Sequence, residues 1–553
     1  MTNPVIPSTK DTIHDPKVGH KGEIRGALGT ISHQTSLAGS SYFRRFRTLL
    51  AILGPGLIVM SGDNDAGAFA IYTHAGQNYG TALLWTLLLL VPIIYINQEM
   101  VLRLGAVSGV GHARLIFERF GKFWGAFSII DLFLLNALTI VTEFVGISLG
   151  LDYLGIPKLF GVAASAAIIM LTASTGDFRR FERFTLFLVF GSLLLIPLFL
   201  MVHPSMSRMA YDFFIPGIPK GGNPEEILLL IIAIVGTTIA PWQLFFQQSY
   251  VIDKRITARF IKYLRIDLWI GIVIVVAGAS AMMGISAFTF AGHPESGMFT
   301  DAGAVASGIA KYHGHVAGIL FAIALIDACI VGASAVSLST AYALGDMFSV
   351  GHSLHKKPAE ALGFYAFFFG LIILAVVLVT APGVPLGLLT NLVQTLAGVL
   401  LPSATVFLLL LCNDKAVLGP WVNSRSINIF TAAIIAILVL LSAILTASEL
   451  FPAMSGKTMV KMMIAGIVIG SLTALSVRLF EKPGSLEGSR EAEIVAIPRD
   501  LWRMPPLDQL PPAKLSLSSR VWMIMLRSYL GVAGGLLLYK LIHLAIFGAA
   551  KSG

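Results

Sequence analysis

Long apolar runs recur along almost the whole chain, and this pattern decides its fold class. A membrane-spanning helix needs about 20 mostly apolar residues. Only 12% of the 553 residues are charged, against roughly 25% in a typical soluble protein. The sequence therefore predicts an all-α polytopic membrane protein with about twelve spans. The runs lie near residues 49–78, 82–102, 124–151, 158–175, 184–202, 226–250, 266–289, 314–345, 360–381, 386–412, 427–447 and 460–479.

The two ends of the chain differ from its apolar middle. Residues 1–47 are polar and basic and lack the apolar run of a cleavable signal, so we expect a cytoplasmic tail. Residues 48–480 form the predicted membrane domain. Residues 481–523 contain two Pro-Pro pairs and mixed charge, which predicts a poorly structured cytoplasmic linker. Residues 524–553 form a predicted helix that either spans the bilayer or lies along its surface.

The positions of basic residues predict the orientation of the chain. With a cytoplasmic N-terminus, 16 Lys and Arg residues fall in loops predicted to be inside and 6 in loops predicted to be outside. The sequence pI of about 9.4 therefore indicates anchoring to a lipid bilayer and not binding to nucleic acid. We expect a multi-pass protein of the cell membrane.

Two of the predicted spans are interrupted, and they lie five spans apart. The first breaks at "SGDNDAG" and the sixth at "GTTIAP". The first span starts inside and the sixth starts outside, so two repeats of five helices would be inverted relative to each other. Broken helices at matching places in inverted halves are typical of a transporter with its site near the bilayer midplane. The predicted fold is a LeuT-like 5+5 inverted repeat.

Acidic residues inside the spans mark the candidate site. A carboxylate at the bilayer centre costs roughly 2.5–3.5 kcal/mol on insertion scales, so Asp63 and Asp65 need a cation, water or protons. Asp327 is a functional candidate by default, although a supporting or neutralised role is equally open. Glu99 and Asp267 lie at span ends, where we expect them to be solvated. Cys329 and Cys412 lie inside spans without metal or redox spacing, which predicts packing roles.

The first span resembles that of the natural-resistance-associated macrophage protein (Nramp) family of divalent metal transporters. In "LGPGLIVMSGDNDAGAFAIYTHAGQNYGTALLW" the family's Asp-Pro-Gly-Asn metal motif falls on residues 65–68. Its Met-Pro-His motif falls on residues 240–242 of "GTTIAPWQLFFQQS". "VTEFVG" places Glu143 on the family's glutamate, and "NLVQTLAGVLLPSA" places Gln394 on its metal-binding glutamine. The resemblance covers roughly residues 48–445.

The departures from the family pattern bear on the substrate. The family's soft methionine ligand, which favours manganese and iron, is Ala240 here, and its asparagine ligand is Ala68. Two methyl groups leave room around Asp65. Mg²⁺ demands octahedral oxygen geometry and usually keeps several waters. This pattern resembles the Nramp-related magnesium transporters, a branch of the family, and it predicts Mg²⁺ as a substrate together with Mn²⁺.

Two further departures concern proton coupling. Proton-coupled members carry a carboxylate one turn before the glutamate of the third span and a histidine after the proline of the sixth. These places hold Ile140 and Trp242, neither of which carries a proton at physiological pH. We therefore expect uptake without protons. A dication moving inward gains roughly 4.6 kcal/mol per 100 mV, twice the single-charge value.

The resemblance and the residues together give five candidate metal ligands. We expect Asp65 to bind the cation directly or through one water, with a purely structural cap as its alternative. Asp63 either belongs to the hydrated cage or caps the inner half-helix. Glu143 is the second carboxylate, with a purely structural role as its alternative. The backbone carbonyl of Thr237 is freed where the sixth helix breaks. Gln394 offers an amide oxygen, or it joins neighbouring helices.

Three other functions remain to be compared with magnesium import. A proton-coupled Mn²⁺ or Fe²⁺ transporter of the Nramp type would acidify the interior during uptake. An amino-acid or organic-cation transporter would bind a substrate carboxylate in the broken helix, where two aspartates repel it. An enzyme is disfavoured, since the spans lack a nucleophile and base pair. We expect no resident cofactor, and the oligomeric state stays open, with a monomer as the working expectation.

Overall fold

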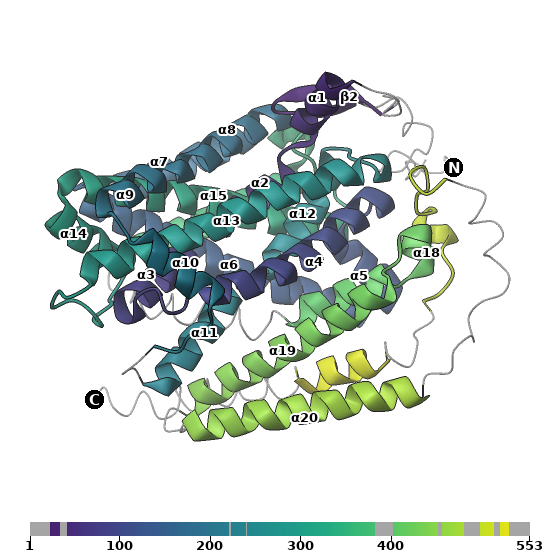
Figure 1. Cartoon of the computed structure of the whole chain (residues 1–553). Helices are drawn as coiled ribbons and strands as arrows, with labels where there is room; N and C mark the ends of the chain where they lie inside the picture. Colours follow the sequence, from purple (N-terminus) through teal and green to yellow (C-terminus); the bar gives the residue numbers. More distant parts are fainter. Residues whose placement is uncertain are drawn as a thin grey trace, which may run out of the picture.

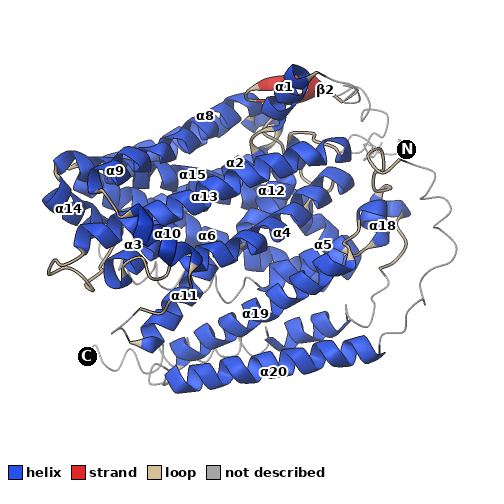
Figure 2. Ribbon diagram, viewed as in Figure 1, coloured by secondary structure: helices blue, strands red, loops and turns tan. Residues whose placement is uncertain are grey.

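The computed structural model describes residues 23–33, 41–219, 223–238, 240–381, 402–451, 456–480, 498–513 and 520–529. These residues are almost entirely helical, with one two-stranded hairpin (Figure 2). Long helices run roughly along one direction and pack side by side into a bundle (Figure 1). The predicted ligand Gln394 lies outside the described residues.

The number of apolar helices agrees with the predicted spans. Eight described helices are long and apolar enough to cross a membrane, and two bent helix pairs raise this to ten. The shorter apolar helix α7 and the 25-residue helix α20 bring the total to about twelve. The main helices are α1 (Tyr42–Ile52), α2 (Pro55–Gly62), α3 (Ala66–Tyr79), α4 (Trp85–Ser108), α5 (His112–Phe120), α6 (Lys122–Tyr153), α7 (Lys158–Ala173), α8 (Phe178–Gly191), α9 (Leu195–Val202), α10 (Met206–Phe214), α11 (Pro224–Thr238), α12 (Pro241–Asp253), α13 (Ile261–Phe290), α14 (Ala302–His313), α15 (His315–Met347), α16 (Leu362–Thr380), α18 (Lys415–Leu418), α19 (Arg425–Leu450) and α20 (Gly456–Phe480).

The loops predicted to be inside meet at one end of the bundle. Arg119 of α5 forms an ion pair with Asp414, just before α18, with 2.6 Å between nitrogen and oxygen. At the end of α12, Asp253 accepts hydrogen bonds from the loop after α15. At the opposite end, Gln77 in the last turn of α3 donates to the Glu295 carbonyl in the loop before α14. The alternation of loops between two ends follows the predicted topology.

A small hairpin from the N-terminal segment is held at the first of these ends. Strands β1 (Glu23–Gly26) and β2 (Gly29–Ser32) pair antiparallel and lie beside α1 and α8 (Figure 1). Lys254 and Glu182 beneath them are fully buried, and the Lys254 ammonium lies 2.7 Å from the Glu182 carboxylate. Glu182 also accepts from the backbone N–H of Ala27 in the hairpin turn. Two spans and part of residues 1–47 are thereby joined through one buried ion pair.

A stretch of the C-terminal segment packs against the same end of the bundle. The Trp421 indole donates to the Arg499 carbonyl at 2.7 Å, and the Arg499 guanidinium stacks over the Trp421 ring. Trp502 is buried against Gly419. Arg119 donates to the Pro511 carbonyl at 2.6 Å. Residues 498–513 therefore connect α5 with the turn that follows α18.

Candidate metal site

The first span breaks where the sequence predicts it. Helix α2 ends at Gly62 and helix α3 begins at Ala66. Asp65 has extended backbone, and its side chain accepts from the Ala68 N–H at 2.9 Å, so it caps α3. The free N–H groups and the dipole at a helix N-terminus favour a carboxylate in this place. The cap uses one oxygen of the Asp65 carboxylate.

Glu143 of α6 meets Asp65 at this break. Its Oε2 accepts from the Ala66 N–H at 3.2 Å, and its carboxyl group lies within hydrogen-bonding reach of that of Asp65. Its Oε1 is buried without a geometric hydrogen bond among the described residues, and the Cys329 thiol of α15 lies within reach of the same carboxyl group. On the far side, the carboxyl packs so tightly against Gly332 of α15 that an added methyl group there would lie 2.8 Å from it. The predicted pairing of these two acids is therefore observed in space.

Asp63 is held by amide side chains from two other helices. Gln243 of α12 donates to one Asp63 oxygen, and Gln98 of α4 donates to Gln243 at 2.8 Å. The second Asp63 oxygen is buried with no partner among the described residues. Asp63 is 1% exposed and follows the last turn of α2, whose negative dipole end repels a carboxylate. Asp63 therefore keeps one oxygen free to accept a further hydrogen bond or to bind an ion. The two glutamines were not found in the sequence because neutral amides leave no charge signal.

The sixth span is also broken, beside the first. Helix α11 ends at Thr238 and α12 begins at Pro241, with Ala240 in extended backbone between them. Thr237 lies in the last turn of α11, where carbonyl groups lack helical partners. The Thr238 hydroxyl lies 2.7 Å from that of Tyr72 on α3. Both predicted breaks are therefore present, and a hydrogen bond joins the two broken helices.

The positions that depart from the family pattern are apolar and largely buried. Ala68 and Ile140 are fully buried, and Trp242 is 1% exposed. The Trp242 ring lies next to Gly62 at the end of α2, and its carbonyl accepts from Ser339 of α15 at 2.9 Å. Trp242 therefore fills volume between the two broken helices and α15.

The break of the first span contains acidic side chains without basic partners among the described residues. Asp63, Asp65 and Glu143 are at most 8% exposed, and within the described ranges no Lys or Arg pairs with any of them. Buried charges without partners are strongly destabilising, so these acids require a cation or protons. Over the same ranges, no three His, Cys, Asp or Glu side chains form a group that can hold a metal by themselves. A bound ion would therefore need carbonyl, amide or water oxygens as well.

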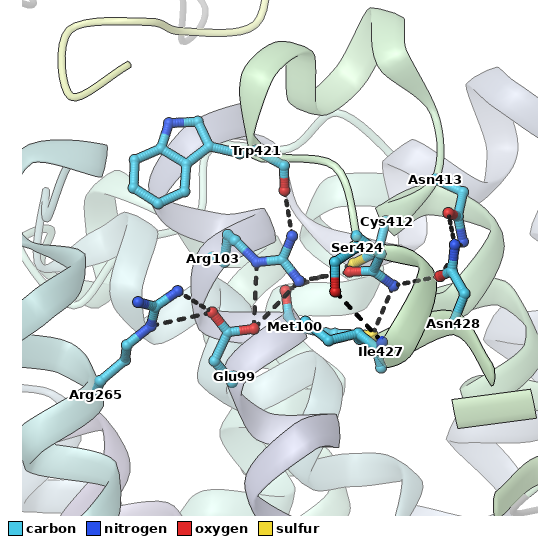
Figure 3. Close-up of polar contacts among 11 residues, drawn as sticks. Glu99, Met100, Arg103, Arg265, Cys412, Asn413, Trp421, Ser424, Ile427 and Asn428 are labelled. Atoms are coloured by element: carbon cyan, nitrogen blue, oxygen red, sulfur yellow. Dashed lines mark hydrogen bonds and ion pairs between the residues drawn. The ribbon is translucent and has the colours of Figure 1, made fainter. Parts of the chain in front are cut away.

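The expectation that the acids at span ends are solvated is wrong. Asp267 is fully buried and accepts from the N–H groups of Gly54 and Gly56 at 3.0 and 2.6 Å, so it caps α2 from α13. Glu99 is 6% exposed and lies between Arg103 and Arg265, with closest ion-pair distances of 3.1 and 2.6 Å (Figure 3). Arg103 also donates to the Trp421 carbonyl (Figure 3). Both acids therefore fix the ends of spans through buried contacts.

Comparison with solved structures defines the class of protein. A manganese transporter of Eremococcus coleocola, solved with an aromatic bis-isothiourea substituted compound, superposes with a TM-score of 0.63 at 20% identity, over 81% of this chain and 96% of that one. MhsT in complex with L-phenylalanine superposes with a TM-score of 0.50 at 15% identity, over 70% of this chain and 98% of that one. The chain is an almost entirely helical membrane protein of the LeuT-like inverted-repeat fold.

Sequence comparison then gives the family. The profile of the natural resistance-associated macrophage protein-like (Nramp) family matches residues 56–448, and the chain belongs to this family. The divalent metal cation transporter MntH of Ralstonia nicotianae is 29% identical over 406 residues, which cover 69% of this chain and 87% of that protein. MntH of Bacillus subtilis is 26% identical over 418 residues, covering 73% and 93%.

Proposed function

We propose that the protein imports divalent metal ions across the cell membrane by alternating access, with Mg²⁺ as a substrate alongside Mn²⁺. One observation carries this proposal: three buried carboxylates gather at the break of the first span, and none is paired with a basic side chain among the described residues. Asp65 and Glu143 would supply two negative charges to a dication. Names of relatives such as the divalent metal cation transporter MntH support metal transport.

The preference for Mg²⁺ is argued from the side chains around Asp65. Ala68 and Ala240 present methyl groups where the family has an amide and a thioether. Without these two ligands a hydrated ion keeps its own waters, and Mg²⁺ gives up its waters reluctantly. The second oxygens of Asp63 and Glu143 are available as acceptors for such waters. We assign further oxygens to the Thr237 carbonyl and, outside the described residues, to the amide of Gln394.

Transport without protons is argued from Ile140 and Trp242. Both are buried, Ile140 in α6 one turn before Glu143 and Trp242 in the first turn of α12. Neither side chain exchanges a proton at physiological pH. The membrane potential alone supplies roughly 4.6 kcal/mol per 100 mV to an entering dication. With the N-terminus on the cytoplasmic side, uptake would need no second ion. The alternative is a proton-coupled Mn²⁺ or Fe²⁺ transporter of the Nramp type.

Uptake into proteoliposomes separates these two functions. Purified protein is reconstituted with an internal pH dye under a negative-inside potential, and Mg²⁺ competes against radiolabelled Mn²⁺. We expect Mg²⁺ to inhibit Mn²⁺ uptake and the internal pH to stay constant during transport. Liposomes without protein are the control for leakage. Entry of protons with Mn²⁺, together with no competition by Mg²⁺, would refute the proposal and support the alternative.

A substitution at Gly332 can test whether Glu143 contributes to metal binding without removing any proposed ligand. A methyl group at this position would lie 2.8–2.9 Å from the Glu143 carboxyl atoms, which is too close, so Gly332→Ala should displace that carboxyl. We expect the apparent affinity for Mn²⁺ to fall about tenfold, within the 10–100-fold range typical of groups that orient metal ligands. Gly370→Ala on α16, where a methyl group meets open space, is the matched control. Equal KM values for the two variants would mean that Glu143 does not contribute to binding.

A further inference from the structure

Asp327 is the one intramembrane acid that the sequence singled out and the proposed metal site does not use. It lies in the middle of α15 and faces α8, where a methyl group on Gly191 would come within 2.5 Å of its carboxylate oxygens. Glu143 packs against a different part of α15, at Gly332. Asp327 and Glu143 therefore pack against different residues, although the Cys329 thiol of α15 lies within electrostatic reach of both, and Asp327 needs its own explanation.

Asp327 opens onto a small cavity beside the broken first span. The volume open to the centre of a sphere the size of a water molecule is about 10 Å³. This is enough space for one water molecule or one small ion. Its polar lining consists of Asp327, Ser61 of α2, Asn64 in the break and Ser192 at the end of α8. The remaining lining residues are apolar: Phe69, Leu195, Ala324 and Ala328.

Asn64 supplies an acceptor for which the described residues offer no partner. Its side chain is 4% exposed, and its amide nitrogen donates to the Val275 carbonyl of α13 at 3.4 Å. This donation assigns the other amide atom, Oδ1, as the acceptor, and that atom is buried with no partner in the described part of the chain. A buried, unpaired amide oxygen costs free energy unless a ligand satisfies it. Asn64 thus points to a ligand independently of Asp327.

The hydroxyl oxygens of the two serines add to the carboxylate and amide oxygens that line the cavity. The Ser192 hydroxyl donates to the Val189 carbonyl at 2.6 Å, so its lone pairs remain free to accept. Ser61 lies in the last turn of α2, where the negative end of the helix dipole attracts a cation. Carboxylate, amide and hydroxyl oxygens are ligands for hard cations.

We propose that Asp327, Asn64, Ser61 and Ser192 form a second cation site that binds Na⁺. One carboxylate neutralises a monovalent ion, whereas a dication would keep an uncompensated charge inside the bilayer. No Lys or Arg among the described residues pairs with Asp327, so the cation itself balances this acid. The site goes beyond the proposed function, because it uses none of the metal ligands. Bound Na⁺ would join α2, α8 and α15 beside the break of the first span.

Binding of ²²Na⁺ to the purified full-length protein in detergent tests the site, with choline as the replacement cation. We expect saturable binding to the wild type and an affinity at least about tenfold lower in Asp327→Asn. Ser192→Ala should also weaken binding, and it keeps the test decisive if the first variant does not fold. Asp152→Asn, at an exposed acid near the end of α6, controls for the loss of a charge.

Asp65→Ala separates this proposal from the metal site, since it should lose metal uptake and keep Na⁺ binding. Two results would overturn the sodium site. One is the absence of saturable Na⁺ binding to the wild type. The other is wild-type affinity in both Asp327→Asn and Ser192→Ala. Loss of Na⁺ binding in Asp65→Ala would equally overturn the separation of the two sites.

Discussion

Replacing Asp65 with alanine is expected to reduce metal uptake to the background of liposomes without protein. Asp65 supplies one of the two carboxylates that face each other at the break of the first span. Its removal takes away a full negative charge in a place where water is scarce, and few other charges can replace it. Uptake of radiolabelled Mn²⁺ into proteoliposomes measures the effect.

The same substitution also removes a helix cap, which must be separated from the loss of charge. Asp65 accepts from the Ala68 N–H, and losing such a cap costs about 1 kcal/mol. Asp65→Asn keeps a good capping residue and removes the charge, so it should be as inactive as alanine. Asp301 caps α14 in the same way, accepting from Ala304 at 2.8 Å, and Asp301→Ala should retain uptake. Full activity of Asp65→Asn would show that Asp65 is only a cap.

The broken spans were predictable because their signals are local. Two aspartates in an apolar run and a proline after Gly-Thr-Thr both interrupt a helix within a few residues. The contact between Asp65 and Glu143 joins residues far apart in sequence, and only the family resemblance placed them together. Once the family register is fixed, the third span brings Glu143 to the break.

The acids at span ends could not be assigned from sequence, because their partners are distant. Asp267 accepts from Gly54, 213 residues away, and Arg265 reaches Glu99 across 166 residues. Hydropathy places such acids at the membrane surface, where water is the default partner. Whether such an acid is buried depends on which helices pack around it, and the hydropathy of a single segment does not give these tertiary contacts.

The amides around the break were missed for a different reason. Gln98, Gln243 and Asn64 are buried at 1–4% exposure, and in the sequence they look like ordinary polar residues of a helix. Inside a bilayer, buried amides need partners as much as charges do, although they leave no pattern of charge. Asp63 and the proposed Na⁺ site both depend on such side chains.

Replacing Ala240 with methionine is expected to shift preference from Mg²⁺ towards Mn²⁺ by roughly 100-fold. Ala240 lies in extended backbone at the start of α12, a conformation open to any L-residue. A thioether would bind Mn²⁺ directly and give Mg²⁺ almost nothing, because Mg²⁺ prefers oxygen. The longer side chain would also displace a water that hydrated Mg²⁺ retains. Each effect at about 1.4 kcal/mol changes the ratio about tenfold.

Ala240→Leu separates the effect of the methionine sulfur from the effect of side-chain volume, since leucine is similar in size to methionine and has no ligand atom. The concentration of Mg²⁺ that halves uptake of radiolabelled Mn²⁺ is measured for both variants. Leucine should hinder both ions and leave their ratio within about tenfold of the wild type, whereas methionine should strengthen Mn²⁺ uptake and weaken Mg²⁺ competition. If the two variants behave alike, Ala240 affects transport through the space that it leaves and not through the absence of a sulfur ligand. The selectivity would then depend on the oxygens of Asp63, Asp65 and Glu143, which would bind either ion by charge.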